Sequence, residues 1–332
     1  MAETIYIIGH KNPDTDSVCS AIALADFYTK QVASEEGEDN AKQNDSEDCA
    51  KQEDSDEFVS AVQGEINEET KFVLNKFGFN VPQILTDGTD KSVILVDHNA
   101  KTQTLDNIEK AKIIGVVDHH AIAFSYSEPI DFSTEAVGST ATMIANMYFE
   151  EGCELDKKIA GILLAAILSD TAIFKSATTT ETDMSAAEML AEVAGIDDIE
   201  AFGWEIKKAK ASLKGKTTEQ IINMDFKDYN MSGKKVGVGQ LEVVDFEDFY
   251  AMKEQIKVTM ETMRQSENYH LVLLAFTDIA REGSEFIAVG DVEVVKKAFN
   301  ISSINRTFLK GIMSRKKQIA PPLENYFNFS KN

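Results

Sequence analysis

One stretch decides the fold of this chain, Ile5-Tyr-Ile-Ile-Gly-His-Lys-Asn-Pro-Asp-Thr-Asp-Ser17. Its β-branched and aromatic start, residues 5–8, predicts a short buried strand. Gly9 ends that strand, and Pro13 forces a turn that is not helical. Ser17 is the predicted N-cap of a helix, because apolar residues recur after it at helical spacing: Val18, Ala21, Ile22 and Ala25. The turn therefore lies where a strand of an open α/β sheet gives way to its crossover helix, the usual place for a ligand crevice.

The same turn carries an imidazole and two carboxylates, from His10, Asp14 and Asp16. Polar groups so close together favour a cation between them, because the two negative charges repel each other. A polar loop with capping aspartates is the alternative, since Asp favours turns and helix starts. This stretch alone leaves both interpretations open.

The composition argues against several classes of protein. The chain has 332 residues, a formal net charge of −23 and three cysteines. This charge disfavours nucleic acid or an anionic membrane surface as the main partner. The scattered cysteines form neither a disulfide framework nor a zinc-ligand pattern. The N-terminus starts directly with a strand and no apolar run could span a bilayer, so we expect a soluble cytoplasmic protein.

Length and pattern predict an α/β protein of two domains. Residues 1–206 are expected to form an N-terminal domain on a parallel sheet. Residues 217–332 are expected to form a smaller α/β domain with a mixed sheet, after a basic linker at 207–216. Within the first domain, residues 34–57 hold eleven acids and almost no apolar side chain, which predicts a solvated, flexible insertion.

Two further predicted strands end in acids and imidazoles. Residues 92–96 are followed by Asp97-His98-Asn99, and residues 112–117 by Asp118-His119-His120. Because the carboxyl ends of parallel strands share one edge of a sheet, we expect these side chains to lie beside His10. An almost wholly apolar helix, residues 158–168, leads to Asp170, and a carboxylate at the end of a buried helix is costly unless it is paired or metal-bound.

Together these segments predict a metal centre. Carboxylates with two imidazoles suit Mn²⁺ or Co²⁺ better than Mg²⁺, and the absence of thiolates argues against structural zinc. Two ions roughly 3.5–4 Å apart can bind a bridging water, lower its pKa and stabilise displacement at phosphorus. We expect Asp118 to orient a histidine ligand, and His98 and His270 to be structural. The predicted ligands are His10, Asp14, Asp16, Asp97, His119 and Asp170.

A basic segment stands near the end of the chain, Ser314-Arg-Lys-Lys-Gln318, followed by Pro321-Pro322 as a predicted stop signal. An exposed basic triplet is usually a solvated loop. In so acidic a protein it is also suited to clamp a phosphate-like anion.

Five segments together resemble one known family: His10-Lys-Asn-Pro-Asp14-Thr-Asp16, Asp97-His-Asn99, Asp118-His-His120, Ser169-Asp170 and Ser314-Arg-Lys-Lys-Gln318. The set is similar to the family II, manganese-dependent inorganic pyrophosphatases, which are DHH phosphoesterases with a DHHA2 C-terminal domain. The Asp-His-His motif alone marks only the superfamily, whereas the first and last motifs are more specific. The resemblance runs from Thr4 to about Pro322, interrupted by the acidic insertion.

The resemblance implies hydrolysis of pyrophosphate to two phosphates by a metal-bridged hydroxide, in a two-metal site at the interdomain cleft. It implies two Mn²⁺ ions per subunit, with Co²⁺ as an alternative, a further Mg²⁺ that enters with substrate, and a homodimer. One ion matches His10, Asp14, Asp97 and Asp170, and the other matches Asp16, Asp97, His119 and Asp170. Asp97 and His120 are the implied catalytic residues, and the implied substrate ligands are His120, Lys227, Arg315 and Lys316.

Two alternatives stay open at this point. An exopolyphosphatase on the same core would use the same ligands, and its relative activity on pyrophosphate and long polyphosphate would distinguish it. A non-enzymatic metal- or anion-binding protein would be favoured by a missing ligand, and none is missing from the matched motifs.

Overall fold

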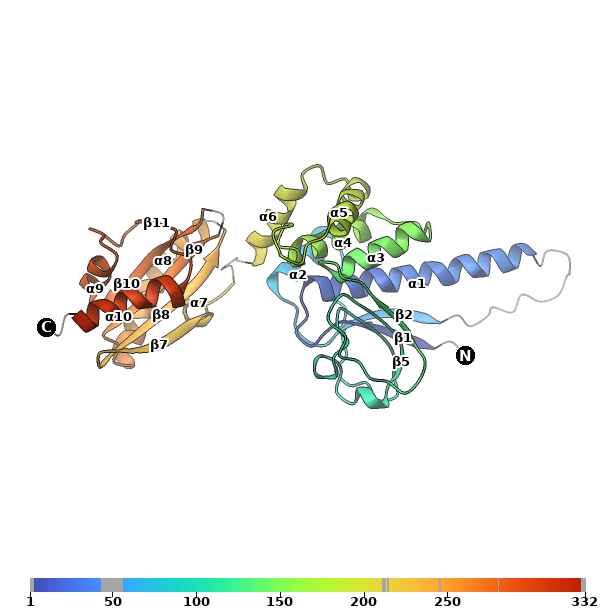
Figure 1. Ribbon diagram of the computed structural model, residues 1–332, viewed down its shortest axis with the longest axis horizontal. Coiled ribbons are helices and arrows are strands. Elements are labelled where there is room, and N and C mark those ends of the chain that lie inside the picture. Colours follow the sequence, from blue (N-terminus) through green and yellow to red (C-terminus); the bar gives the residue numbers. More distant parts are fainter. Residues whose placement is uncertain are drawn as a thin grey trace. The chain divides into compact units, whose positions relative to one another are not determined.

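The computed structural model describes residues 3–42, 56–210, 213, 215–244, 246–279 and 281–329. The chain divides into two compact units, residues 1–210 and residues 211–332 (Figure 1). Helix α6 (Ile199–Lys210) runs into the predicted linker, so residues 207–210 are helical. The domain boundaries at 206 and 217 remain a proposal. Every helix in the described part of the chain is too short or too polar to span a bilayer.

The first unit is built on a six-stranded sheet in which every strand pair is parallel. Its strands are β1 (Thr4–Ile8), β2 (Glu57–Val62), β3 (Gln83–Ile84), β4 (Ser92–Val96), β5 (Lys112–Asp118) and β6 (Asp131–Thr134). They follow the spatial order β3-β2-β1-β4-β5-β6. The chain winds outward from β1 on one side and then returns to β4 on the other. This order places the topological switch point between β1 and β4, where open α/β sheets bind their ligands.

Helices cover one face of this sheet (Figure 1). They are α1 (Thr15–Lys42), α2 (Glu68–Phe77), α3 (Thr140–Glu150), α4 (Lys157–Asp170), α5 (Glu181–Ala194) and α6. The sequence of α4 is nearly all apolar because residues 159–168 are all buried. The opposite face packs Ile8 and Leu95 against Leu105 and Ile108, which lie in and beside the 3₁₀ turns Lys101–Gln103 and Ile108–Lys110.

Two predictions about the first helix are wrong. Ser17 lies inside α1, and the cap is Asp14, whose Oδ1 accepts a hydrogen bond of 3.0 Å from the Ser17 backbone N–H. The helix also continues through residues 34–42, which were expected to belong to a flexible insertion. The polar composition of this segment suggested a flexible insertion. Acidic and amide side chains are, however, also compatible with a solvated helix. Residues 43–55 of the predicted insertion lie outside the described residues.

The second unit has a mixed five-stranded sheet. Its strands are β7 (Phe226–Met231), β8 (Lys234–Val243), β9 (Leu271–Asp278), β10 (Gly283–Gly290) and β11 (Leu309–Lys310), in the order β11-β10-β9-β8-β7. Only the β8–β9 pair is parallel. The two sheets confirm the predicted fold class, a parallel-sheet α/β domain and a smaller α/β domain with a mixed sheet.

Helices cover both faces of the second sheet. The helices α7 (Thr218–Asn223) and α8 (Glu247–Ser266) pack on one face, and α9 (Val292–Ala298) and α10 (Ala320–Phe329) on the other. The predicted stop at Pro321-Pro322 is wrong, because both prolines lie in the first turn of α10. Proline is well tolerated there, since the first-turn N–H groups have no partner within a helix.

Candidate metal centre

The carboxyl edge of the first sheet gathers the predicted ligands. His10 follows β1, Asp97 follows β4 and His119 follows β5, so three neighbouring strands each deliver one group. Asp14 and Asp16 lie at the start of α1, and Asp170 is the last residue of α4. Segments that are distant in sequence therefore converge at the switch point of the sheet.

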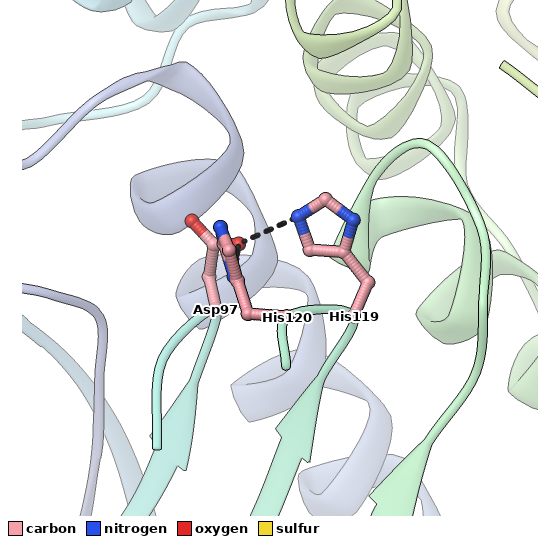
Figure 2. Close-up of side chains that lie close together, drawn as sticks. All are labelled: Asp97, His119 and His120. Atoms are coloured by element: carbon pink, nitrogen blue, oxygen red, sulfur yellow. Dashed lines mark ion pairs between the residues drawn. The ribbon is translucent and has the colours of Figure 1, made fainter. Parts of the chain in front are cut away.

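The predicted ligands fall into two groups that share Asp97, and a third group of possible ligands consists of Asp97, His119 and His120. One group contains His10, Asp14 and Asp97, and the other contains Asp16, Asp97, His119 and Asp170, with the ligand atoms of each group within 4.8 Å of one another. The Oδ2 atom of Asp97 lies 3.4 Å from His10 Nε2, and its Oδ1 atom lies 3.5 Å from His119 Nε2. Figure 2 shows the contact between Asp97 and His119. The two oxygens of one carboxylate thus face the two groups, while Asp170 belongs to the second.

The backbone is unusual at one candidate ligand and shortly after another. Asp97 has a φ of 59°, in the left-handed region that residues other than glycine seldom adopt. Directly after Asp170 and Thr171, residues 172–174 all have positive φ, between 51° and 59°. Strain of this kind persists where the surroundings hold it and is concentrated at functional sites.

Helix α3 begins at the candidate metal centre, and groups at its N-terminus contact two of the acids. The buried carboxylate of Asp16 accepts hydrogen bonds from the backbone N–H groups of Thr140 (2.7 Å) and Ala141 (3.0 Å), and from the Ser139 hydroxyl (2.8 Å). The Thr140 hydroxyl donates to Asp97 Oδ1 at 3.0 Å. The N-terminus of the helix therefore stabilises negative charge on Asp16. Sequence reasoning did not single out residues 139–141 as partners of these acids, because a helix start does not reveal which distant carboxylate it meets.

The crowded carboxylates shift one another's pKa. Burial raises the pKa of Asp170 to about 10, and the charges of Asp16 and Asp97 add to this effect. Burial likewise raises the pKa of Asp16 to about 7. Burial opposes a charged His119, but hydrogen bonding to Asp97 outweighs it and raises the pKa of this imidazole to about 10. Asp97 itself has a lowered pKa despite its burial, because His10 and His119 both contact it. The centre thus favours added positive charge, which a divalent cation would supply.

The orientation of His119 fits a metal ligand. Its Nδ1 lies 2.9 Å from the Val137 carbonyl oxygen, and only an N–H can bond to that acceptor. In the neutral imidazole, the form that binds a metal, the lone pair is therefore on Nε2, which faces Asp97 Oδ1 at 3.5 Å. A ligating imidazole typically bonds a backbone carbonyl through its other nitrogen in this way. Together with the carboxylates around it, this donor set suits Mn²⁺.

Asp118 contacts the second histidine of its motif. It orients His120, not the candidate ligand His119: its Oδ1 accepts from His120 Nδ1 at 2.8 Å, and Asn99 donates to its Oδ2 at 2.5 Å. This contact raises the pKa of His120, whose side chain is 52% exposed. His120 Nδ1 also lies 3.7 Å from Asp97 Oδ1 (Figure 2).

The other two histidines belong to none of these groups. His98 is fully buried, and its Nδ1 lies 2.8 Å from the Val96 carbonyl oxygen. Its Nε2 has no hydrogen-bond partner within the described ranges, and the structural role of His98 stays a prediction. His270 precedes β9 and pairs with Asp291 at 3.2 Å, in the second unit.

The predicted anion-binding cations lie in the second unit. Arg315 begins a π-helical turn (Arg315–Ile319) and is buried, with Nη1 2.8 Å from Asp225 Oδ1. Its backbone N–H donates to Gln240 Oε1 at 2.6 Å. Lys316 in the same turn and Lys227 on β7 are exposed. Two residues that sequence reasoning did not single out, Asp225 and Gln240, thus hold Arg315 in place.

The fold and the site define a two-part phosphoesterase of the DHH type. The DHH family N-terminal domain matches residues 4–167, and the DHHA2 domain matches residues 204–326. The chain belongs to the family of manganese-dependent inorganic pyrophosphatases, which are hydrolases.

Its relatives match over nearly their whole length. The manganese-dependent inorganic pyrophosphatase of Methanocaldococcus jannaschii is 44% identical, over 97% of this chain and 99% of that protein. The enzyme of the same name from Methanothrix thermoacetophila is 42% identical, over 98% and 99%. A crystal structure of a Methanococcus jannaschii protein assigned to the family II inorganic pyrophosphatases superimposes with a TM-score of 0.58 at 43% identity, covering 98% of this chain and 99% of that one.

Proposed function

We propose that this chain hydrolyses inorganic pyrophosphate to two phosphates at a centre that holds two Mn²⁺ ions. One observation carries the proposal: Asp97 turns one oxygen toward His10 and the other toward His119. A single carboxylate between two groups of donors is the arrangement that two adjacent divalent ions need. The names of the relatives support pyrophosphate as the substrate and manganese as the metal.

The residues for each ion follow from the two groups. His10, Asp14 and Asp97 would hold one, and Asp16, Asp97, His119 and Asp170 the other, with Co²⁺ as an alternative ion. When bound, two such ions lower the pKa of water between them and neutralise charge that develops at phosphorus. Asp170 was expected to serve both ions, but its carboxylate falls only in the second group.

His120 is proposed to bind substrate and to move a proton. Asp118 accepts a hydrogen bond from the Nδ1–H of His120, which orients the ring and leaves Nε2 free to face the substrate. The raised pKa of His120 keeps the imidazole ready to donate a proton to a phosphate oxygen. Its exposure is consistent with a group that meets substrate directly.

The cations of the second unit are proposed to neutralise pyrophosphate. Arg315 offers a planar guanidinium held by Asp225, which matches a phosphate with two parallel hydrogen bonds. Lys316 and Lys227 would add point charges, and a further Mg²⁺ would enter with the substrate. We propose that these groups meet the metal centre in a cleft between the two domains, that the enzyme works in the cytoplasm, and that it forms homodimers.

The test is phosphate release by purified protein that has been stripped of metal by a chelator. The protein is reloaded with Mn²⁺, Co²⁺ or Mg²⁺ and given pyrophosphate, tripolyphosphate and long-chain polyphosphate side by side. We expect fast release from pyrophosphate, strongest with Mn²⁺ or Co²⁺. Preference for long chains would instead indicate an exopolyphosphatase, and no release with any metal would contradict an enzymatic role.

A further inference from the structure

A buried glutamate lies between two segments that carry metal-centre acids. Glu69 is in the first turn of α2 and is 2% exposed. Neither a motif nor the two groups of donors includes it. A buried carboxylate is costly unless hydrogen bonds satisfy it, so its partners are informative.

Its partners are hydroxyls from the start of α1 and the end of α4. The Oε1 atom of Glu69 accepts a hydrogen bond from Thr15 Oγ1 at 2.8 Å and another from Ser169 Oγ. Thr15 stands between Asp14 and Asp16, and Ser169 directly precedes Asp170. One oxygen atom therefore connects the segments that deliver three of the candidate ligands.

The glutamate is itself held in place. The Asn67 side chain caps α2 by accepting from the backbone N–H and hydroxyl of Thr70, at 2.9 and 3.1 Å. The Thr70 hydroxyl lies 3.1 Å from the hydroxyl of Thr15, and both residues are fully buried. Such a network rigidifies the groups that it joins, because each member restricts the rotamers of the next.

We infer that Glu69 is a positioning residue that fixes the spacing between the acids of α1 and Asp170, and so sets the affinity of the second group for Mn²⁺. The inference rests on the metal centre proposed above. Glu69 acts through the hydroxyls of Thr15 and Ser169. Their hydrogen bonds to Oε1 fix the positions of the two segments, and so of the carboxylates next to Thr15 and Ser169 in the chain. Partners of metal ligands typically change metal affinity or activity about 10–100-fold when they are substituted.

The experiment measures Mn²⁺ binding to stripped protein, by the electron paramagnetic resonance signal of free Mn²⁺. Thr15→Val keeps the shape of the side chain and removes the hydroxyl, whereas Thr15→Ser keeps the hydroxyl. We expect Thr15→Val and Ser169→Ala each to raise the dissociation constant about 10–100-fold, and Thr15→Ser to stay near the unsubstituted protein. This rescue by a conservative variant separates the hydrogen bond from a general loss of packing.

A double-mutant cycle assigns the effect to the glutamate. In a Glu69→Ala background, Ser169→Ala should weaken Mn²⁺ binding little further, because residues that act through one another are not additive. Tyr148→Phe is the matched control. It removes a hydroxyl in the same unit that donates to Asp26 Oδ2 at 2.7 Å, and neither Tyr148 nor Asp26 belongs to a group of candidate ligands. It should lower the free energy of unfolding and leave Mn²⁺ affinity unchanged.

The outcomes distinguish a failure of the inference about Glu69 from a failure of the proposed metal centre on which it rests. Normal Mn²⁺ affinity in Thr15→Val and Ser169→Ala would overturn the role of Glu69 and leave the metal centre standing. An equal loss in Thr15→Ser would also overturn it. Absence of Mn²⁺ binding by the unsubstituted chain would overturn both. The single hydroxyl variants decide the question even when Glu69→Ala does not fold.

Discussion

The acidic centre of the first unit and the cations of the second are built in different ways. The acids come from the start of α1 and from the ends of β4 and α4, and Asp16 and Asp97 are almost completely buried. Among the three cations only Arg315 is buried, and Lys227 and Lys316 are exposed. The centre is fixed by the whole fold of its unit, whereas the cations depend on one turn and one edge strand. Metal binding and substrate binding should therefore be separable by mutation.

The largest effect is expected from Asp97→Asn. Replacing the shared carboxylate removes a negative charge that faces both groups, so activity and Mn²⁺ affinity should fall together. We expect a loss of more than about 100-fold in each, which is larger than the effect of substituting a residue that only hydrogen-bonds to a metal ligand. Phosphate release and Mn²⁺ titration measure the two effects.

Asp156→Asn is the matched control for this change. Asp156 caps α4 by accepting from the backbone N–H groups of Lys158 and Ile159. Asn caps a helix about as well as Asp, so activity should change little. Near-normal turnover by Asp97→Asn would contradict the assignment of the centre.

Sequence patterns placed the candidate metal ligands on one edge of the sheet because acids and imidazoles directly follow the predicted strands. The strand β4 has the predicted bounds, since a β-branched run leaves few alternatives. Once β1, β4 and β5 are parallel neighbours, the positions of His10, Asp97 and His119 follow. That these residues bind metal stays a prediction.

The supporting residues could not be found in the same way. Thr140 contacts Asp97 and Glu69 contacts Ser169 across sequence separations of 43 and 100 residues. Hydroxyls and single glutamates are common in helices and loops, so nothing in the sequence marks these pairs. The same holds for Asp118, which had two neighbouring histidines as candidate partners and bonds the second.

Metal should stabilise the first unit. Ligands that bind the folded state add about 2.7 kcal/mol at a free concentration of 100 times the dissociation constant. For a unit of this size that corresponds to a rise of roughly 5–10 °C in Tm. Trp204, the only tryptophan of the chain, lies on α6 in this unit, so its fluorescence reports the transition. Asp97→Asn should abolish most of the shift, and an unchanged Tm in the unsubstituted protein would argue against a metal centre.

Arg315→Ala should affect substrate and spare the metal. A hydrogen bond to a charged group contributes about 1.5–3 kcal/mol, so kcat/KM should fall roughly 10–100-fold. The dissociation constant for Mn²⁺ should stay the same, because the acids lie on other elements. Lys316→Ala should cost less, since an exposed ammonium makes a weaker, screened interaction. A parallel loss of Mn²⁺ affinity in Arg315→Ala would break the proposed separation.

The smallest effect is expected from Gln240→Leu. Gln240 accepts from the Arg315 backbone N–H at 2.6 Å and donates to the Thr277 hydroxyl and the Met313 carbonyl, both at 2.8 Å. Removing the amide frees the start of the π-helical turn, and a neutral hydrogen bond contributes about 0.5–1.5 kcal/mol, so kcat/KM should fall roughly 2–10-fold.

Gln265→Leu, on exposed Gln265 of α8 in the same unit, is the matched control and should leave kcat/KM unchanged. Because Gln240 acts through Arg315, its substitution should add almost nothing in an Arg315→Ala background. Additive losses would mean that Gln240 acts on the substrate independently of the arginine.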